Sequence, residues 1–184
     1  MAILATAFWR RLDISGRDAA RLEEKKEGYE LLGQSVFLGA SGPTALRYVL
    51  YLDHDWSTIE GRITGFIGNR EIDDHIERTP SGWNFNGRDC GMADIVDLDL
   101  GFTPATNMIQ LKRASLEIGE TTRFDVAWLE AGDADLQRLP QKYHRASELE
   151  YPYESPQGDY KATIALDRSG FAARYPGLWE IERA

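Results

Sequence analysis

Apolar and polar residues alternate with a period of two along much of this chain. The alternation is clearest in the runs 46–52, 124–128 and 161–166. The apolar or aromatic members of these runs are Leu46, Tyr48, Leu50 and Leu52, then Phe124, Val126 and Trp128, then Ala162, Ile164 and Leu166. Residues two apart lie on one face of a β-strand, and turn-forming glycine or proline residues recur between the runs. The pattern predicts an all-β, mainly antiparallel fold with hairpin connections.

Two charged segments fit this pattern less well. Residues 17–27 (RDAARLEEKKE) are rich in good helix formers and could begin a helix at Ser15. Residues 70–78 (REIDDHIER) place Ile72 and Ile76 four positions apart, as a helix would. Each segment also suits a charged, exposed strand, so the spacing leaves both alternatives open.

Composition and charge narrow the class of protein. The 184 residues contain no internal repeat and no long linker, so we expect one domain over residues 1–184. Hydrophobic residues make up 42% of the chain and charged residues 28%, which is typical of a globular protein. The net charge of -9 argues against binding to nucleic acid or to anionic lipid surfaces, which needs clustered basic residues.

The sequence offers no membrane span and no cysteine pair. No apolar run reaches the roughly 18 residues that a membrane-spanning helix needs. Cys90 is the only cysteine, so an internal disulfide is excluded. The short apolar run at Ala2–Trp9 has no basic residue ahead of it, unlike a signal peptide, and we expect a cytoplasmic protein.

Most candidate catalytic and metal motifs are weak. The three residues Asp53, His54 and Asp55 could ligate a divalent ion, but they follow a predicted strand, where aspartate is a common turn residue. There is no G-x-S-x-G motif, and Asp89 beside Cys90 would raise the pKa of the thiol. We therefore predict no metal site, no cofactor and no nucleophilic residue.

The stretch IVDLDLGFTPATN, residues 95–107, carries the strongest chemical signal. In a strand, Asp97 and Asp99 would share one face about 6.6 Å apart, a spacing within the range of an inverting glycosidase pair. The same spacing describes any solvated strand face. Alternation predicts that Val96, Leu98 and Leu100 enter the core, and that the strand stops at the following proline. We expect Thr106 and Asn107 to bond the backbone of the turn that follows.

An ordered set of motifs resembles one known family. After FWRRLD near the start come YLDHDW, GW at Trp83, DCG around Cys90, and DLDLGFTPATN. LKRASLEIGE, QKYHR at residues 141–145 and ARYPGLWE complete the set. Together they cover essentially the whole chain, and they resemble the bacterial family described as "putative glycolipid-binding".

The resemblance implies a fold and a set of site residues. It implies a single-domain spiral β-roll, similar in shape to periplasmic carriers of lipids and lipoproteins, and it makes both ambiguous segments strands. The inner face of a rolled sheet must be filled by side chains or hold a ligand. The polar and aromatic residues of the matched motifs are the candidate ligand-binding set: Trp56, Asp97, Asp99, Asn107, Arg113, Gln141, Tyr143 and Arg145. They form either the polar part of a pocket or an internal network, for example an acid paired with Arg113.

Three functions remain open at this point. The first is a non-enzymatic protein that binds a lipid or glycolipid in the concave face of the rolled sheet. The second is a sugar-directed hydrolase or isomerase that uses Asp97 and Asp99 as acid and base. The third is an interaction domain that meets another protein through a sheet edge or aromatic patch. The high aromatic content, with 5 Trp, 8 Tyr and 7 Phe, favours the first.

Overall fold

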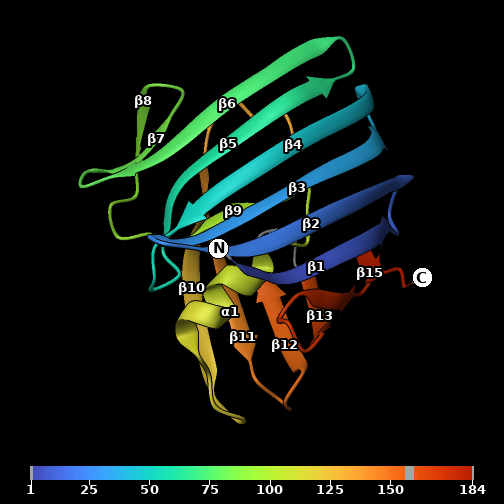
Figure 1. Cartoon of the computed structure of the whole chain (residues 1–184), viewed down its shortest axis with the longest axis vertical. Helices are drawn as coiled ribbons and strands as arrows, with labels where there is room; N and C mark the ends of the chain where they lie inside the picture. Colours follow the sequence, from blue (N-terminus) through green and yellow to red (C-terminus); the bar gives the residue numbers. More distant parts are fainter. Residues whose placement is uncertain (1, 156–159, 184) are drawn as a thin grey trace.

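The computed structural model describes residues 2–155 and 160–183. Within these residues one 15-stranded sheet runs in the order β8-β7-β6-β5-β4-β3-β2-β1-β15-β14-β13-β12-β11-β10-β9, and one helix accompanies it (Figure 1). The elements are β1 Ala2–Arg11, β2 Gly16–Lys25, β3 Gly28–Gly39, β4 Gly42–Leu52, β5 Thr58–Ile67, β6 Arg70–Thr79, β7 Gly82–Phe85, β8 Arg88–Gly91, β9 Leu98–Leu100, α1 Asn107–Ala114, β10 Thr121–Leu129, β11 Gln137–His144, β12 Glu150–Ser155, β13 Tyr160–Leu166, β14 Ala172–Tyr175 and β15 Trp179–Ile181. The prediction of an all-β, mainly antiparallel fold is confirmed.

The chain starts in the middle of the sheet and finishes beside its own beginning. Strands β1 to β8 proceed outward to one edge, and the chain then passes to β9 at the opposite edge. Strands β10 to β15 return to the middle, where β15 pairs with β1 and Trp9 lies opposite Ile181. The pairing of β9 with β10 is parallel and the other strand pairs are antiparallel. Because β8 and β9 are both edges, the sheet is rolled but not closed.

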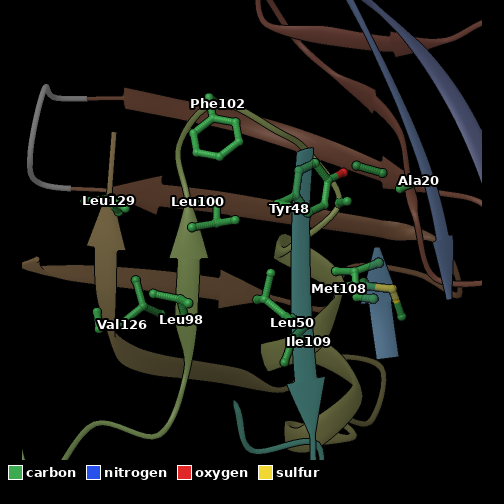
Figure 2. Packing of buried hydrophobic residues seen from close by; sticks show 14 of the residues in the cluster. Ala20, Tyr48, Leu50, Leu98, Leu100, Phe102, Met108, Ile109, Val126 and Leu129 are labelled. Carbon is green, nitrogen blue, oxygen red and sulfur yellow. The ribbon is translucent and has the colours of Figure 1, made fainter. Parts of the chain in front are cut away.

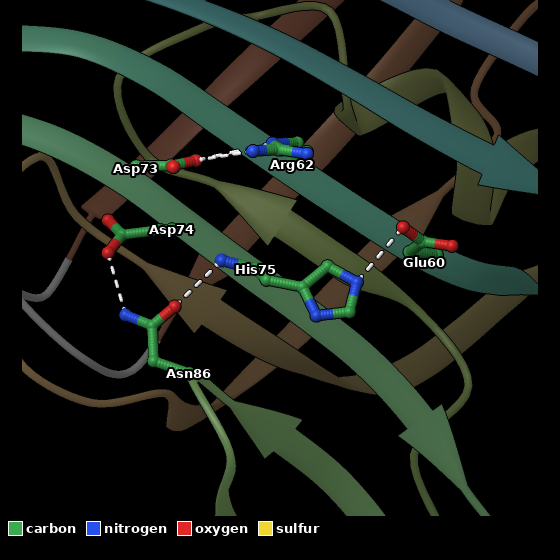
Figure 3. A network of polar contacts seen from close by, with 6 residues as sticks. All are labelled: Glu60, Arg62, Asp73, Asp74, His75 and Asn86. Carbon is green, nitrogen blue, oxygen red and sulfur yellow. Dashed lines mark hydrogen bonds and ion pairs between the residues drawn. The ribbon is translucent and has the colours of Figure 1, made fainter.

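The two ambiguous segments are strands, β2 and β6. In β6 every charged side chain between the buried Ile72 and Ile76 can reach a neighbouring strand or turn (Figure 3). Asp73 accepts hydrogen bonds from Arg62 of β5, and the ring of His75 lies 2.9 Å from the carboxylate of Glu60. These cross-strand pairs explain how a sequence with helix-like spacing is held in a sheet, since pairing partners outweigh local propensity.

The interior of the roll is filled by the chain segment around β9. Leu98 and Leu100 are fully buried and face Tyr48 and Leu50 of β4 (Figure 2). Gly61 of β5 makes this approach possible, because a Cβ at that position would lie 2.9 Å from the Leu98 side chain. Val96, which we expected in the core with the two leucines, is only half-buried. It precedes the strand, where its carbonyl accepts a hydrogen bond from the Thr58 amide.

Side chains of the first half of the sheet satisfy the backbone of this inserted segment. The Trp83 indole donates to the Ile95 carbonyl at 3.1 Å, and the Ser35 hydroxyl donates to the Phe102 carbonyl at 3.0 Å. The Leu98 amide donates to the Thr58 hydroxyl. An edge strand with open backbone groups invites further pairing. Here β9 is instead covered by the concave face of the sheet.

Helix α1 was not anticipated by our sequence analysis, which expected a turn after Pro104. Its residues from Asn107 to Leu111 are buried, so the helix belongs to the filling of the roll. Good helix formers occupy most of NMIQLKRA, and Lys112 and Arg113 lie in the last turn, where the helix dipole favours cations. Eight residues form too short a span to cross a membrane, and no other helix occurs in the described ranges.

Candidate functional site

Asp97 is held in a buried ion pair. Its carboxylate is 1% exposed and accepts hydrogen bonds from Nε and Nη2 of Arg113, at 3.1 and 2.5 Å. Arg113 reaches it from the last turn of α1, and its guanidinium also lies 5.3 Å from the ring centroid of Phe124. Burial raises the pKa of Asp97, and the nearby Arg113 partly offsets this. The expected pairing of an acid with Arg113 is confirmed for Asp97.

Asp99 belongs to a separate network, in which its hydrogen-bond partners are neutral. The Thr106 hydroxyl donates to its Oδ1 at 2.6 Å, and the Gln141 amide donates to its Oδ2 at 2.7 Å. The side-chain carbonyl oxygen of Gln141 accepts a hydrogen bond from the Tyr143 hydroxyl at 3.3 Å. The Tyr143 hydroxyl in turn accepts a hydrogen bond from the side-chain amide of Asn107, also at 3.3 Å. All five residues are buried. Four of them, all except Thr106, were predicted site residues, and the rolled sheet brings them together from β9, β11 and α1.

Thr106 links β9 to the turn that precedes α1. Its hydroxyl accepts the Leu100 amide while donating to Asp99, so the hydroxyl bonds the turn backbone as we expected. It therefore makes no side-chain cap to α1, although it occupies the N-cap position. Asn107 does not bond the turn and contacts Tyr143 instead. That part of our expectation was wrong, because Asn107 is the first helical residue and points toward β11.

A cavity of about 340 Å³ lies beside the Asp99 network. It is bordered by β9, the start of α1, and the strands of the second half of the sheet. Its lining residues are Asp99, Leu100, Gly101, Thr103, Asn107, Trp128, Glu130, Leu139, Tyr153, Ser155, Tyr160, Tyr175, Leu178 and Trp179. The volume is at the lower end of the range for small-molecule sites, about 300–1,000 Å³. Asp99 and Asn107 thus serve both the network and the cavity wall.

Aromatic side chains form much of the cavity wall. Tyr153, Tyr160 and Tyr175 contact one another with ring centroids 5.6–6.0 Å apart. Their planes are inclined by 54–80°, so the rings meet as a corner rather than as a stack. Burial raises the pKa of Tyr153 to about 12, so this hydroxyl remains protonated at neutral pH. Trp128 and Trp179 complete the aromatic lining.

Two carboxyl groups border the cavity. Burial raises the pKa of Asp99 and of Glu130. Repulsion by Asp97 raises the pKa of Asp99 further, and repulsion by Asp133 and Asp99 does the same for Glu130. In the described residues neither carboxylate forms an ion pair, although Arg11 partly lowers the pKa of Glu130. Glu130 lies close to Gly101, where a Cβ would be only 2.3 Å from its Oε1. Glycine at this position lets Glu130 and the Trp128 indole approach the backbone.

Of the eight predicted site residues, Asp99 and Asn107 line the cavity, and Arg145 and Trp56 lie outside the cavity, the Asp99 network and the Asp97 ion pair. Arg145 donates to the carbonyl of Leu116 at 2.5 Å and borders a second cavity of about 330 Å³. Trp56 lies at the β4–β5 connection and stacks on Tyr29, with ring centroids 3.9 Å apart. The two residues were selected from motifs that are far apart in the rolled sheet. Arg145 does not pair with either Asp97 or Asp99.

The geometry argues against an acid–base pair formed by Asp97 and Asp99. Asp97 is neutralised by Arg113, while Asp99 is bound by neutral donors and borders the cavity. A general acid and base must both reach the substrate. In the described residues no group of three or more His, Cys, Asp or Glu side chains is arranged as metal ligands would be. The DHD triplet forms a turn in which Asp53 accepts from the amides of Asp55 and Ser57.

The comparisons with known proteins agree with the resemblance of the motifs. The family described as "Putative glycolipid-binding" matches residues 6–181. The chain belongs to this family. Its members share the description, which names a class of ligand without stating which residues bind it. No match was found among curated protein sequences.

A solved structure shares the fold of this chain. The crystal structure of a DUF1089 family protein from Pseudomonas aeruginosa superposes with a TM-score of 0.76. The two sequences are 24% identical, and the match covers 89% of this chain and 91% of that chain. At this identity the likeness concerns the fold alone.

Sequence reasoning missed most of the cavity wall. Tyr153 of β12, Tyr160 of β13 and the acid Glu130 fall outside the motifs that carried the resemblance, whereas Tyr175 of β14 lies within ARYPGLWE but was not selected as a site residue. Trp128 was expected on a buried strand face and is half-buried, because it borders the cavity. The available signal was the density of tyrosine in the last third of the chain. It did not reveal which of these rings would meet.

Proposed function

We propose that this protein binds an amphiphilic small molecule, a glycolipid or related lipid, without catalysing a reaction. The observation that carries the proposal is the cavity of about 340 Å³, walled by aromatic rings and bordered by Asp99 and Asn107. Small-molecule sites typically combine apolar and aromatic walls with a few fixed polar groups. The family description supports the class of ligand.

The cavity suits a head group better than a whole lipid. Its volume is near the minimum for a small-molecule site, so a long acyl chain would have to extend out of it. Each buried methylene contributes about 0.8 kcal/mol, so even a short covered stretch of chain would give useful affinity. We propose that Asp99 and Asn107 select the head group. Their positions are fixed by hydrogen bonds to Thr106, Gln141 and Tyr143.

Native mass spectrometry and a titration test this proposal. Protein purified from bacteria should carry lipid, and added lipids and glycolipids should change tryptophan fluorescence, because Trp128 and Trp179 line the cavity. The variant Leu178→Trp should fill the cavity and abolish both signals. The matched control Tyr51→Phe changes an exposed ring of β4 and should leave both intact. A clean ligand-free mass together with no response to any lipid would refute the proposal.

The expected cytoplasmic location and the expected single domain stay predictions from the sequence. We also propose that nucleic acid is not a partner, since the chain carries a net charge of -9.

A further inference from the structure

We infer that the cavity beside Asp99 accepts a positively charged ammonium head group, primary or quaternary, in preference to neutral and anionic ones. This inference rests on the proposed function for the location of the ligand, and it adds the charge of the group that enters. Three features of the cavity support it: its carboxyl groups, its cluster of tyrosine rings, and the absence of basic side chains from its described lining.

The first feature is the pair of carboxyl groups that form no ion pair within the described residues. Asp99 accepts hydrogen bonds only from the neutral Thr106 and Gln141, and Glu130 accepts only a backbone amide at 3.4 Å. Burial raises the pKa of Glu130, and repulsion by Asp133 and Asp99 adds to this rise, while Arg11 partly offsets it. A cation in the cavity would relieve both costs, since an opposite charge stabilises an ionised carboxylate. Asp97 differs, because Arg113 already supplies its cation.

The second feature is the corner formed by Tyr153, Tyr160 and Tyr175. These three rings line the cavity with centroids 5.6–6.0 Å apart and planes inclined at 54–80° to one another. The face of an aromatic ring is negative and attracts a cation, and several rings around one ammonium group form the aromatic cages that bind quaternary amines. Trp128 and Trp179 add larger rings to the same wall.

The third feature is that the described residues lining the cavity include no lysine, arginine or histidine. Arg11 lies 5.1 Å from the Trp179 ring centroid and lowers the pKa of Glu130 in part, but it does not line the cavity and its guanidinium is hydrogen-bonded to Asp13. The second cavity contrasts with this one, because Lys112, Arg145 and Arg168 border it. An anionic head group in the first cavity would meet carboxylates without a compensating charge, which is strongly unfavourable in a poorly hydrated site.

A head group without any chain tests the inference directly. Choline and its uncharged isostere dimethylbutanol have almost the same shape, so calorimetric titration of each isolates the effect of the charge. We expect choline to bind at least about ten-fold more tightly, which corresponds to about 1.4 kcal/mol. Equal affinity for the two compounds, or no binding of choline, would overturn the inference.

Variants assign the effect to the cavity. Glu130→Gln should weaken choline binding about ten-fold and leave dimethylbutanol unchanged, whereas Glu71→Gln removes the same charge from the exposed face of β6 and should change neither. Tyr160→Phe retains the aromatic face and should retain binding, while Tyr160→Leu should lose several-fold. If Glu130→Gln and Tyr160→Leu both fold, as judged by melting temperature, and both keep wild-type choline affinity, the inference is wrong.

Amphiphiles with one chain and three head groups separate this inference from the proposed function. We expect dodecyltrimethylammonium to bind more tightly than dodecyl glucoside, and dodecanoate to bind least. If the glucoside or the carboxylate binds as tightly as the ammonium compound, the preference for cations is refuted and the lipid-binding proposal stands. If no dodecyl compound binds, the lipid-binding proposal fails, and the choline titration still decides the chemistry of the cavity.

Discussion

Asp18 of β2 is a carboxyl group buried in the core without a cation. It is 1% exposed, and the Tyr48 hydroxyl donates to its Oδ1 at 2.9 Å while its Oδ2 has no partner in the described part of the chain. The same hydroxyl lies 2.9 Å from Thr103, which borders the cavity. Burial raises the pKa of Asp18 from 3.8 to about 7, because the surrounding hydroxyls only partly compensate for lost hydration.

This shift predicts an unusual dependence of stability on pH. In the unfolded chain Asp18 ionises near its ordinary pKa of 3.8, whereas in the folded protein it stays protonated up to about pH 7. Its contribution to stability is therefore complete below about pH 4 and is lost as the pH rises to about 7. The difference corresponds to on the order of 4 kcal/mol.

The variant Asp18→Asn should remove this dependence. We expect it to unfold with similar free energy to the wild type near pH 4 and to be clearly more stable at pH 7.5, as measured by urea denaturation. The control Glu71→Gln, at an exposed position, should show no comparable difference between the two pH values. A wild-type-to-variant difference for Asp18→Asn that is the same at both pH values would contradict the prediction.

The Asp97–Arg113 ion pair yields a second prediction at this scale. Removal of one partner leaves the other buried and uncompensated, which costs about 3–5 kcal/mol for fully buried pairs. Because the Arg113 side chain is 29% exposed, we expect a smaller loss of about 2–3 kcal/mol for Arg113→Leu at neutral pH. The loss should shrink at acid pH, where the unpaired Asp97 takes up a proton. Asp97→Ala should cost about 1–3 kcal/mol.

Chemical denaturation of both variants checks this estimate. Arg123→Leu is the matched control, because Arg123 is exposed on β10, and it should stay within about 0.5 kcal/mol of the wild type. If Arg113→Leu is as mild as this control, the ion pair has no structural role.

At the scale of elements, the seam between β1 and β15 joins the two ends of the chain. Trp9 lies there, with no exposed surface, and its indole donates to the Ala172 carbonyl at 2.6 Å. It also makes an edge-on contact with Phe171, with ring centroids 5.3 Å apart. The Trp9 side chain thus links β1 to the start of β14 and to Phe171 just before it.

Trp9→Ala should therefore destabilise the protein by about 3–5 kcal/mol, through the lost burial, the cavity left behind and the lost hydrogen bond. Phe8→Ala is a suitable control, because Phe8 lies on the opposite face of the same strand and is 45% exposed. We expect less than about 1 kcal/mol for it. Equal losses in the two variants, measured by thermal or urea denaturation, would mean that the seam does not depend on Trp9.

At the scale of the whole molecule, the inserted segment connects the two halves of the sheet. Residues 95–106 bond to Ser35, Thr58 and Trp83 on one side and to β10 on the other. Figure 1 shows β1–β6 and β10–β13 as two groups of strands with β9 and α1 between them. Without residues 95–106 and α1 between them, neither group of strands could bury its inner face.

The two halves should consequently unfold in one step. Trp83 lies in the first half and Trp128 in the second, so variants that retain one of these as their single tryptophan, with the other four replaced by phenylalanine, report on each half. We expect both fluorescence transitions in urea to coincide with the loss of the far-ultraviolet dichroism signal. Separate midpoints for the two reporters would show that the halves unfold independently.

The alternation of residues along the sequence determined the strands of this protein and which of their side chains are buried. The alternation of apolar and polar residues in β4 and in the other strands with this pattern requires extended backbone. Only that geometry places Leu46, Leu50 and Leu52 on one buried face. The same alternation brought Leu98 and Leu100 into the core and made Asp97 and Asp99 neighbours in the interior. The motif order was sufficient to indicate the family and hence the rolled sheet.

Tertiary structure decided the partners of those residues. After β8 the chain passes from one edge of the sheet to the other. This passage decides which strand pairs with β9, and it lets α1 bring Arg113 back to Asp97. The cavity wall likewise joins Asp99 to Glu130 and to three tyrosines up to 76 residues away, and no sequence period relates such positions. The local sequence pattern determines on which face of a strand a side chain lies, because successive side chains alternate. The rolling of the sheet determines which residues pack against that face.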